Sequence, residues 1–194
     1  MPVPRSGITE IDHLRAAPFV DAVAPLFERA PGFLWRLAAA RGGPFGSWDG
    51  LFARARAVAH EMPEPLQVDL VDAHPRLGAR RDRLSAMSAR EQGVADLGDA
   101  ADLADAAGQR TADETTATLR RLNADYEARF GFRYCVCVAG RPLAALVPAF
   151  EAALGADRPA ELHRALDAVV DIARARHDVS AERVAGADAG RPAS

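Results

Sequence analysis

One apolar stripe in the second half of the chain constrains the fold most. Within residues 111–130, Leu119, Leu122, Tyr126 and Phe130 follow one another at intervals of three or four. That spacing places the four side chains on one face of an α-helix, and Gly131 stands where the helix is expected to end. The pattern therefore predicts a long helix with one buried face.

The composition favours helices in the rest of the chain. Alanine makes up over a fifth of the 194 residues, whereas aromatic residues make up 6%. Alanine has the highest helix propensity, and strands favour β-branched and aromatic residues. Turn signals divide the chain into predicted helices at residues 8–16, 19–29, 32–40, after the N-cap Ser47, 66–73, 88–97, 111–130, 143–154 and 159–176. Pro25 is expected to interrupt the second of these.

These patterns predict an all-α fold, a single-domain helical bundle of about eight helices that spans residues 1–180. Residues 133–138 (RYCVCV) are rich in β-branched and aromatic residues, and we expect them to form one short extended segment. Residues 181–194 lack regular apolar positions, and we expect them to be a flexible tail.

The charged residues exclude several classes of protein. All 24 basic residues are arginines. Without lysine the chain can form neither a Schiff base nor a phosphate-binding loop of the usual kind, so pyridoxal-phosphate enzymes and P-loop kinases are excluded. The net charge is -3 and the arginines are scattered. We therefore expect no nucleic-acid partner.

The remaining features indicate a cytoplasmic protein. The first residues contain no apolar segment of a signal peptide, and no run of 18 apolar residues could span a membrane. The two cysteines, Cys135 and Cys137, would point to opposite faces of an extended segment, so we expect reduced thiols rather than a disulfide. Further ligands are missing near them, so we expect no metal site.

His74 is the strongest candidate for acid or base chemistry. It lies at the end of the predicted helix 66–73 and directly before Pro75, and a residue before proline avoids helical angles. A histidine there can exchange a proton near neutral pH. The alternative is a helix-capping or surface histidine.

Ser88 and Glu91 match the S-x-x-E capping box that begins many helices. On the pattern alone, local capping is the favoured interpretation. The chemical interpretation is compatible with it, because the beginning of a helix also binds anions.

Arg176 interrupts the apolar face of the last predicted helix. Leu162, Leu166, Val169 and Ala173 form that face, and Arg176 occupies its next position. Its side chain could extend to solvent, or it could bind a carbonyl or carboxylate in a cleft. Arg174, by contrast, falls on the polar side of the helix.

Several motifs appear in an order typical of one family. They are Phe19-Val20-Asp21, Gly43-Pro44-Phe45, His74-Pro75-Arg76-Leu77-Gly78, the S-x-x-E-Q motif that ends at Gln92, the L-N-x-x-Y-x-x-x-F-G-F motif of residues 122–132, and the closing helix up to Arg176. In this order the chain resembles the 2-oxo-4-hydroxy-4-carboxy-5-ureidoimidazoline (OHCU) decarboxylases of the urate pathway.

The resemblance implies a fold, a reaction and a set of residues. It implies an all-α homodimer that uses no metal or cofactor and converts the small molecule OHCU to (S)-allantoin. It implies that His74 and Glu91 are catalytic. The residues that it implies for substrate binding are Ser88, Gln92, Arg176 and Pro75.

Two alternatives remain open at this point. Arg133 stands where the family commonly has proline, which motivates a related decarboxylase or lyase that acts on another ureido or imidazoline acid. The second alternative is a non-catalytic all-α interaction module. It predicts that His74, Glu91 and Arg176 do not converge on one cavity.

Overall fold

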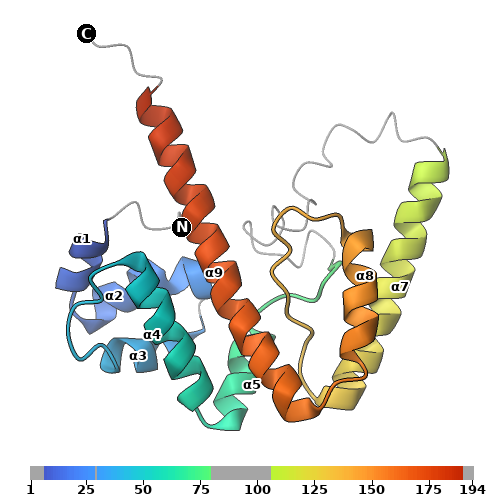
Figure 1. Cartoon of the computed structure of the whole chain (residues 1–194), viewed down its shortest axis with the longest axis horizontal. Coiled ribbons are helices and arrows are strands. Elements are labelled where there is room, and N and C mark those ends of the chain that lie inside the picture. Colours follow the sequence, from blue (N-terminus) through green and yellow to red (C-terminus); the bar gives the residue numbers. More distant parts are fainter. Residues whose placement is uncertain (1–6, 29, 80–105, 190–194) are drawn as a thin grey trace.

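The regular elements of the structure are helices (Figure 1). The computed structural model describes residues 7–28, 30–79 and 106–189, and no strand occurs within these ranges. The all-α prediction is therefore confirmed, while the predicted helix 88–97 lies outside the described residues. The elements are α1 (Ile8–His13), α2 (Ala16–Val23), the 3-10 helix η1 (Ala24–Phe27), α3 (Pro31–Ala39), α4 (Trp48–Glu61), α5 (Glu64–Asp72), α7 (Ala106–Phe130), α8 (Leu143–Ala153) and α9 (Arg158–Ala189).

Helix α9 is the central element of the bundle. Figure 1 shows it running between the N-terminal helices α1–α4 on one side and the α7–α8 pair on the other. It contacts α4, α5 and η1, whereas α7 packs against α8. Residues of α9 therefore meet both the end of η1 and the helix that precedes His74.

Pro25 changes the second predicted helix as expected. The α-helical hydrogen bonds of α2 end at Val23, and η1 begins at Ala24 with Pro25 in its first turn. Proline lacks the N–H that would continue the α-helix. The predicted helix 8–16 is shorter than expected, because α1 ends at His13 and α2 begins at Ala16.

The predicted stripe on α7 is confirmed. Leu119, Leu122, Tyr126 and Phe130 are all buried. The Tyr126 hydroxyl donates a hydrogen bond to Glu161 of α9 at 2.6 Å. Residues 133–138 cross this face without joining a strand. The ring of Tyr134 stacks on Phe150 of α8 at a centroid distance of 3.8 Å.

Helix α9 is longer than the predicted helix 159–176, since it continues to Ala189. The domain boundary at residue 180 stays a prediction. Within the described ranges, no helix combines the length and the hydropathy that crossing a bilayer requires.

Candidate active site

His74 lies directly beyond the end of α5. The helix ends at Asp72, and the His74 N–H donates a hydrogen bond to the Val71 carbonyl at 3.0 Å. Pro75 follows and prevents a further helical turn. The His74 residue is 3% exposed. The predicted position at a helix end is confirmed, and the alternative of a surface histidine is wrong.

The two ring nitrogens of His74 differ in their surroundings. Nδ1 lies 3.3 Å from the Leu70 carbonyl oxygen. A carbonyl oxygen can only accept, so the proton of the neutral ring belongs on Nδ1. Nε2 is buried and has no hydrogen-bond partner among the described residues. It therefore presents a lone pair that can accept a proton or a hydrogen bond.

Burial keeps His74 neutral at neutral pH. Burial and, after it, the positive charge of Arg176 lower the pKa of His74 to about 4, while the negative charge of Glu28 acts in the opposite direction. His74 is consequently a neutral base in the resting protein.

Arg176 is buried in spite of its charge. It is 2% exposed. Its Nη1 donates hydrogen bonds to the carbonyls of Leu26 at 3.1 Å and Pro25 at 3.4 Å. Its Nη2 donates to Glu28 Oε1 at 2.6 Å. The guanidinium thus points toward the end of η1, and the expectation that it could extend to solvent is wrong.

Glu28 is a residue that the sequence did not single out. It caps η1 in the left-handed conformation, with φ 48° and ψ 30°, and its side chain is 12% exposed. The nearby signal in the sequence is Pro25, which marks a break in the helix. That signal does not identify a carboxylate as the partner of Arg176.

Arg133 holds the carboxyl end of α5. Its Nη1 donates hydrogen bonds to the carbonyls of Asp72 at 2.6 Å and His74 at 2.9 Å. Its backbone N–H donates to Asp72 Oδ1 at 2.8 Å. The guanidinium of Arg133 is therefore in contact with the backbone of the helix end that precedes Pro75.

The loop after His74 is fixed to α7. Asn123 Nδ2 donates to the Leu77 carbonyl at 3.0 Å, and Arg76 makes two hydrogen bonds of 2.6 Å to Glu127. Gly78 has φ +75°, and a Cβ there would lie 2.9 Å from a methyl carbon of Leu119. Only glycine fits this close approach without strain. Rigid attachment on both sides holds His74 in place.

The structure buries two of the predicted site residues, His74 and Arg176, and the charge of Arg176 acts on the His74 ring. Pro75, which follows His74, is half-buried. Ser88, Glu91 and Gln92 lie outside the described residues. Their predicted roles stay predictions.

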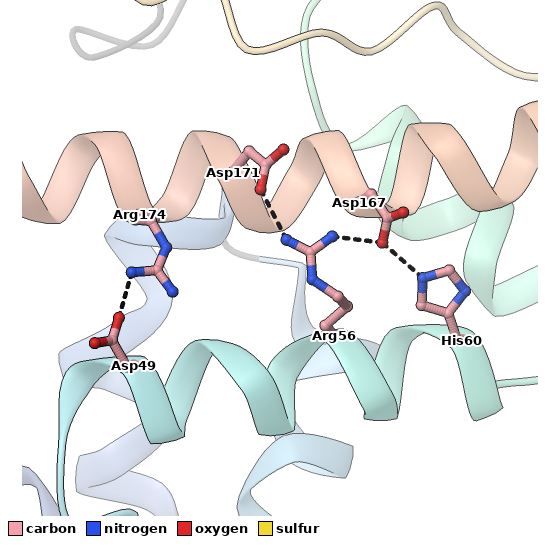
Figure 2. A network of polar contacts seen from close by, with 6 residues as sticks. All are labelled: Asp49, Arg56, His60, Asp167, Asp171 and Arg174. Atoms are coloured by element: carbon pink, nitrogen blue, oxygen red, sulfur yellow. Dashed lines mark hydrogen bonds and ion pairs between the residues drawn. The ribbon is translucent and has the colours of Figure 1, made fainter.

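The polar face of α9 carries a separate set of ion pairs with α4 (Figure 2). Arg56 bridges Asp167 at 2.5 Å and Asp171 at 2.7 Å, and His60 Nε2 lies 2.8 Å from Asp167. Arg174 pairs with Asp49, so its predicted position on the polar side is confirmed. Across the part of the chain that the structure describes, no group of three or more potential ligands is arranged to hold a metal.

Comparisons with known proteins identify the relatives of this chain. Residues 12–178 match the family model described as OHCU decarboxylase. The 2-oxo-4-hydroxy-4-carboxy-5-ureidoimidazoline decarboxylase of Haloferax volcanii is 30% identical over 169 residues, which cover 87% of this chain and 92% of that protein. The uric acid degradation bifunctional protein PucL of Bacillus subtilis is 28% identical over 167 residues, or 86% of this chain and 31% of that protein.

A solved structure supports the fold. The crystal structure of (S)-allantoin synthase matches with a TM-score of 0.63 at 15% identity, over 90% of this chain and 54% of that chain. At this identity the match supports the all-α architecture alone. The family match, by contrast, covers most of the chain and includes both His74 and Arg176. The chain belongs to the OHCU decarboxylase family.

Proposed function

We propose that this protein decarboxylates OHCU to (S)-allantoin without a metal or organic cofactor, with His74 as the acid/base group. The observation that carries the proposal is the environment of His74. A buried, neutral imidazole presents an Nε2 that has no hydrogen-bond partner among the described residues, and the charge of the buried Arg176 guanidinium acts on the ring. The names of the Haloferax volcanii and Bacillus subtilis relatives support the choice of substrate.

The reaction needs little more than acid/base groups and orientation. As the bond to the carboxylate breaks and CO2 leaves, its electron pair forms a C=C bond to the carbon of the adjacent C=N group, and the C=N π electrons move onto the nitrogen, which takes a proton from solvent. The hydroxyl proton passes to His74 Nε2 as the C–O bond becomes a carbonyl. His74 returns that proton to the neighbouring carbon from one face, which sets the S configuration. A neutral base is suited to the first proton transfer.

The other family residues complete the proposed site. Arg176 binds a ring carbonyl of the substrate, because a guanidinium donates hydrogen bonds in a fixed geometry. Glu91 orients His74 and disfavours the substrate carboxylate by its like charge. Ser88, Gln92 and Pro75 contact the substrate.

The proposal also includes the protein's setting. As the family resemblance implies, it acts as a homodimer, and we place it in the cytoplasm. The two cysteines support a reducing compartment, because Cys135 is buried, Cys137 is half-buried and they form no disulfide with each other. The dimer is tested by the mass of the purified protein in solution.

The decisive experiment measures stereospecific turnover of fresh OHCU by circular dichroism. Spontaneous decay gives racemic allantoin, so an excess of the S enantiomer reports catalysis. His74→Asn should lose about 10²–10⁴-fold in rate, the usual contribution of one acid/base group. His13→Asn is the matched control, since His13 is exposed on α1. Near wild-type turnover by His74→Asn would disprove the role of His74.

The structure weakens both alternatives. Arg133 motivated a different ureido or imidazoline acid, but its guanidinium binds backbone carbonyls at the end of α5. A non-catalytic module predicts that His74, Glu91 and Arg176 do not converge on one cavity, and it gives no reason for the burial of both His74 and Arg176. Absence of any excess of (S)-allantoin with the wild-type protein would return both alternatives to consideration.

A further inference from the structure

The backbone of Glu28 does not explain why a glutamate stands there. Among the described residues, Glu28 and Ala139 are the non-glycine residues with positive φ. The left-handed conformation is unfavourable for a residue with a Cβ, and glycine or asparagine adopts it more readily. The contacts of the Glu28 side chain must therefore account for the glutamate at this position.

The side chain completes a set of acceptors around Arg176. The carbonyls of Pro25 and Leu26 accept from Nη1, and the Glu28 carboxylate accepts from Nη2. These acceptors come from one short stretch at the end of η1. Because the two terminal nitrogens are held by different groups, the plane of the guanidinium is fixed.

Glu28 also offsets the charge of Arg176. Its carboxylate lies against the guanidinium in a buried position, where opposite charges interact strongly. A substrate carboxylate that enters this site meets a cation whose charge is already compensated. This matters for decarboxylation, since tight pairing with the carboxylate in the ground state would stabilise the anion that must leave as CO2.

We propose that Glu28 is a positioning residue that orients the Arg176 guanidinium and offsets its charge. Arg176 then donates to a neutral oxygen of the substrate instead of pairing with the departing carboxylate. This inference rests on the proposed decarboxylation.

The first test is the steady-state kinetics of Glu28→Gln with OHCU. This variant keeps the size of the side chain and removes its charge. We expect kcat to fall about 10- to 100-fold, the effect of one charge-assisted hydrogen bond, while KM stays constant or decreases because a guanidinium whose charge Glu28 no longer offsets binds the anionic substrate more tightly. Unchanged kcat, or a raised KM with unchanged kcat, overturns the inference.

Two further variants make this test independent of folding defects. Glu28→Asn suits the left-handed backbone but is too short to replace the carboxylate, and it should reproduce the kinetics of Glu28→Gln. Asp49→Asn is the matched control. It removes a carboxylate from another arginine of α9, Arg174, and should leave kcat and KM unchanged.

A double-mutant cycle shows whether Glu28 acts through Arg176. If it does, Glu28→Gln has a much smaller effect on kcat in an Arg176→Lys background than in the wild type. If Glu28→Gln lowers kcat by the same factor in both backgrounds, the inference is overturned, because Glu28 would then act independently of Arg176.

A measurement without substrate separates this inference from the proposed function. In a ¹⁵N-arginine NMR spectrum, slow rotation of a fixed guanidinium gives resolved Nη signals, which Arg176→Lys assigns. Glu28→Gln should broaden them and Asp49→Asn should not. If the wild type fails to turn over OHCU, the proposed function fails, while these signals still test the orientation of Arg176. Resolved Nη signals of Arg176 that persist in Glu28→Gln overturn the inference that Glu28 orients the guanidinium.

Discussion

Arg174 and Arg176 of helix α9 lie two residues apart, and the ion pairs that they form differ in their exposure to solvent. Arg174 pairs with Asp49 at the surface, where the side chains are 44% and 79% exposed. Arg176 pairs with Glu28 where the side chains are 2% and 12% exposed. Water screens the first pair and leaves its partners independent. Exclusion of water makes the second pair a fixed charge distribution that acts on His74.

The exposed network shows how burial and hydrogen bonds act in opposite directions on a charged side chain. Burial alone would raise the pKa of Asp167, but hydrogen bonds from His60 and Arg56 outweigh burial and hold that pKa below its ordinary value. Solvent is still available if one of these partners is lost. At the buried pair solvent is largely excluded, so loss of one charged partner leaves a buried charge that water cannot compensate.

The largest expected difference is between Arg176→Met and Arg174→Met. Removal of one partner from a buried pair lowers the free energy of unfolding by about 3–5 kcal/mol. Removal of one partner from an exposed pair changes it by about 0–1 kcal/mol. Urea denaturation measures both, and equal changes in the two variants would contradict the comparison.

A second prediction uses the low pKa of His74 and concerns stability rather than turnover. Between the ordinary value of 6.5 and about 4, the unfolded chain binds a proton that the folded protein does not. The contribution of His74 to the free energy of unfolding is therefore fully present above pH 6.5 and decreases as the pH falls toward 4. A pKa difference of one corresponds to about 1.4 kcal/mol, so the whole decrease is about 3 kcal/mol.

Comparison with His74→Asn isolates this contribution. Other titratable groups contribute to both proteins and cancel in the difference. The free energy of unfolding of the variant, measured by urea denaturation across this pH range, should depend less steeply on pH. Parallel curves for the two proteins would show that His74 is not held neutral by burial.

Arg133 occupies an environment between those of the two pairs. It is half-buried and donates to two carbonyls at the end of α5. Arg133→Met keeps most of the side-chain volume and removes both hydrogen bonds, so we expect the free energy of unfolding to fall by about 1–3 kcal/mol. We also expect a lower kcat, because the backbone at His74 loses a support. A lower free energy of unfolding with unchanged kcat would show that Arg133 stabilises the fold and does not contribute to catalysis.

The smallest effect is expected at Asp171. Arg56 retains Asp167 when Asp171→Asn removes its second partner. The free energy of unfolding, measured by thermal denaturation, should therefore change by less than about 0.5 kcal/mol. In about 1 M salt the Debye length falls to about 3 Å, and the remaining difference should disappear. A larger effect would show that the network on α4 and α9 is not an ordinary surface feature.

Local patterns in the sequence predicted the helices well. The spacing of Leu119 through Phe130 specifies the buried face of α7, because helical periodicity needs no knowledge of distant residues. Pro25 likewise specifies the change from α2 to η1. The break between α1 and α2 was predicted too late in the chain, after residue 16, since neither glycine nor proline stands between His13 and Ala16.

The site was predictable only in part. His74 was found because proline follows a helix end, and Arg176 because it interrupts an apolar stripe. Glu28 lies 148 residues from Arg176 along the chain, and no local pattern encodes a contact over that separation. The same holds for Arg133 and the carbonyls of Asp72 and His74. Partners that tertiary packing brings together need the fold to identify them.

The buried pair of Glu28 and Arg176 has an evolutionary consequence. Loss of either residue alone leaves a buried charge without its ion-pair counterion, whereas replacement of both by apolar residues is often neutral or stabilising in proteins. A lineage released from selection for catalysis should therefore lose the two residues together, with glycine or asparagine at position 28 and an aliphatic residue at position 176. Their joint absence would mark a stable, inactive descendant of this fold.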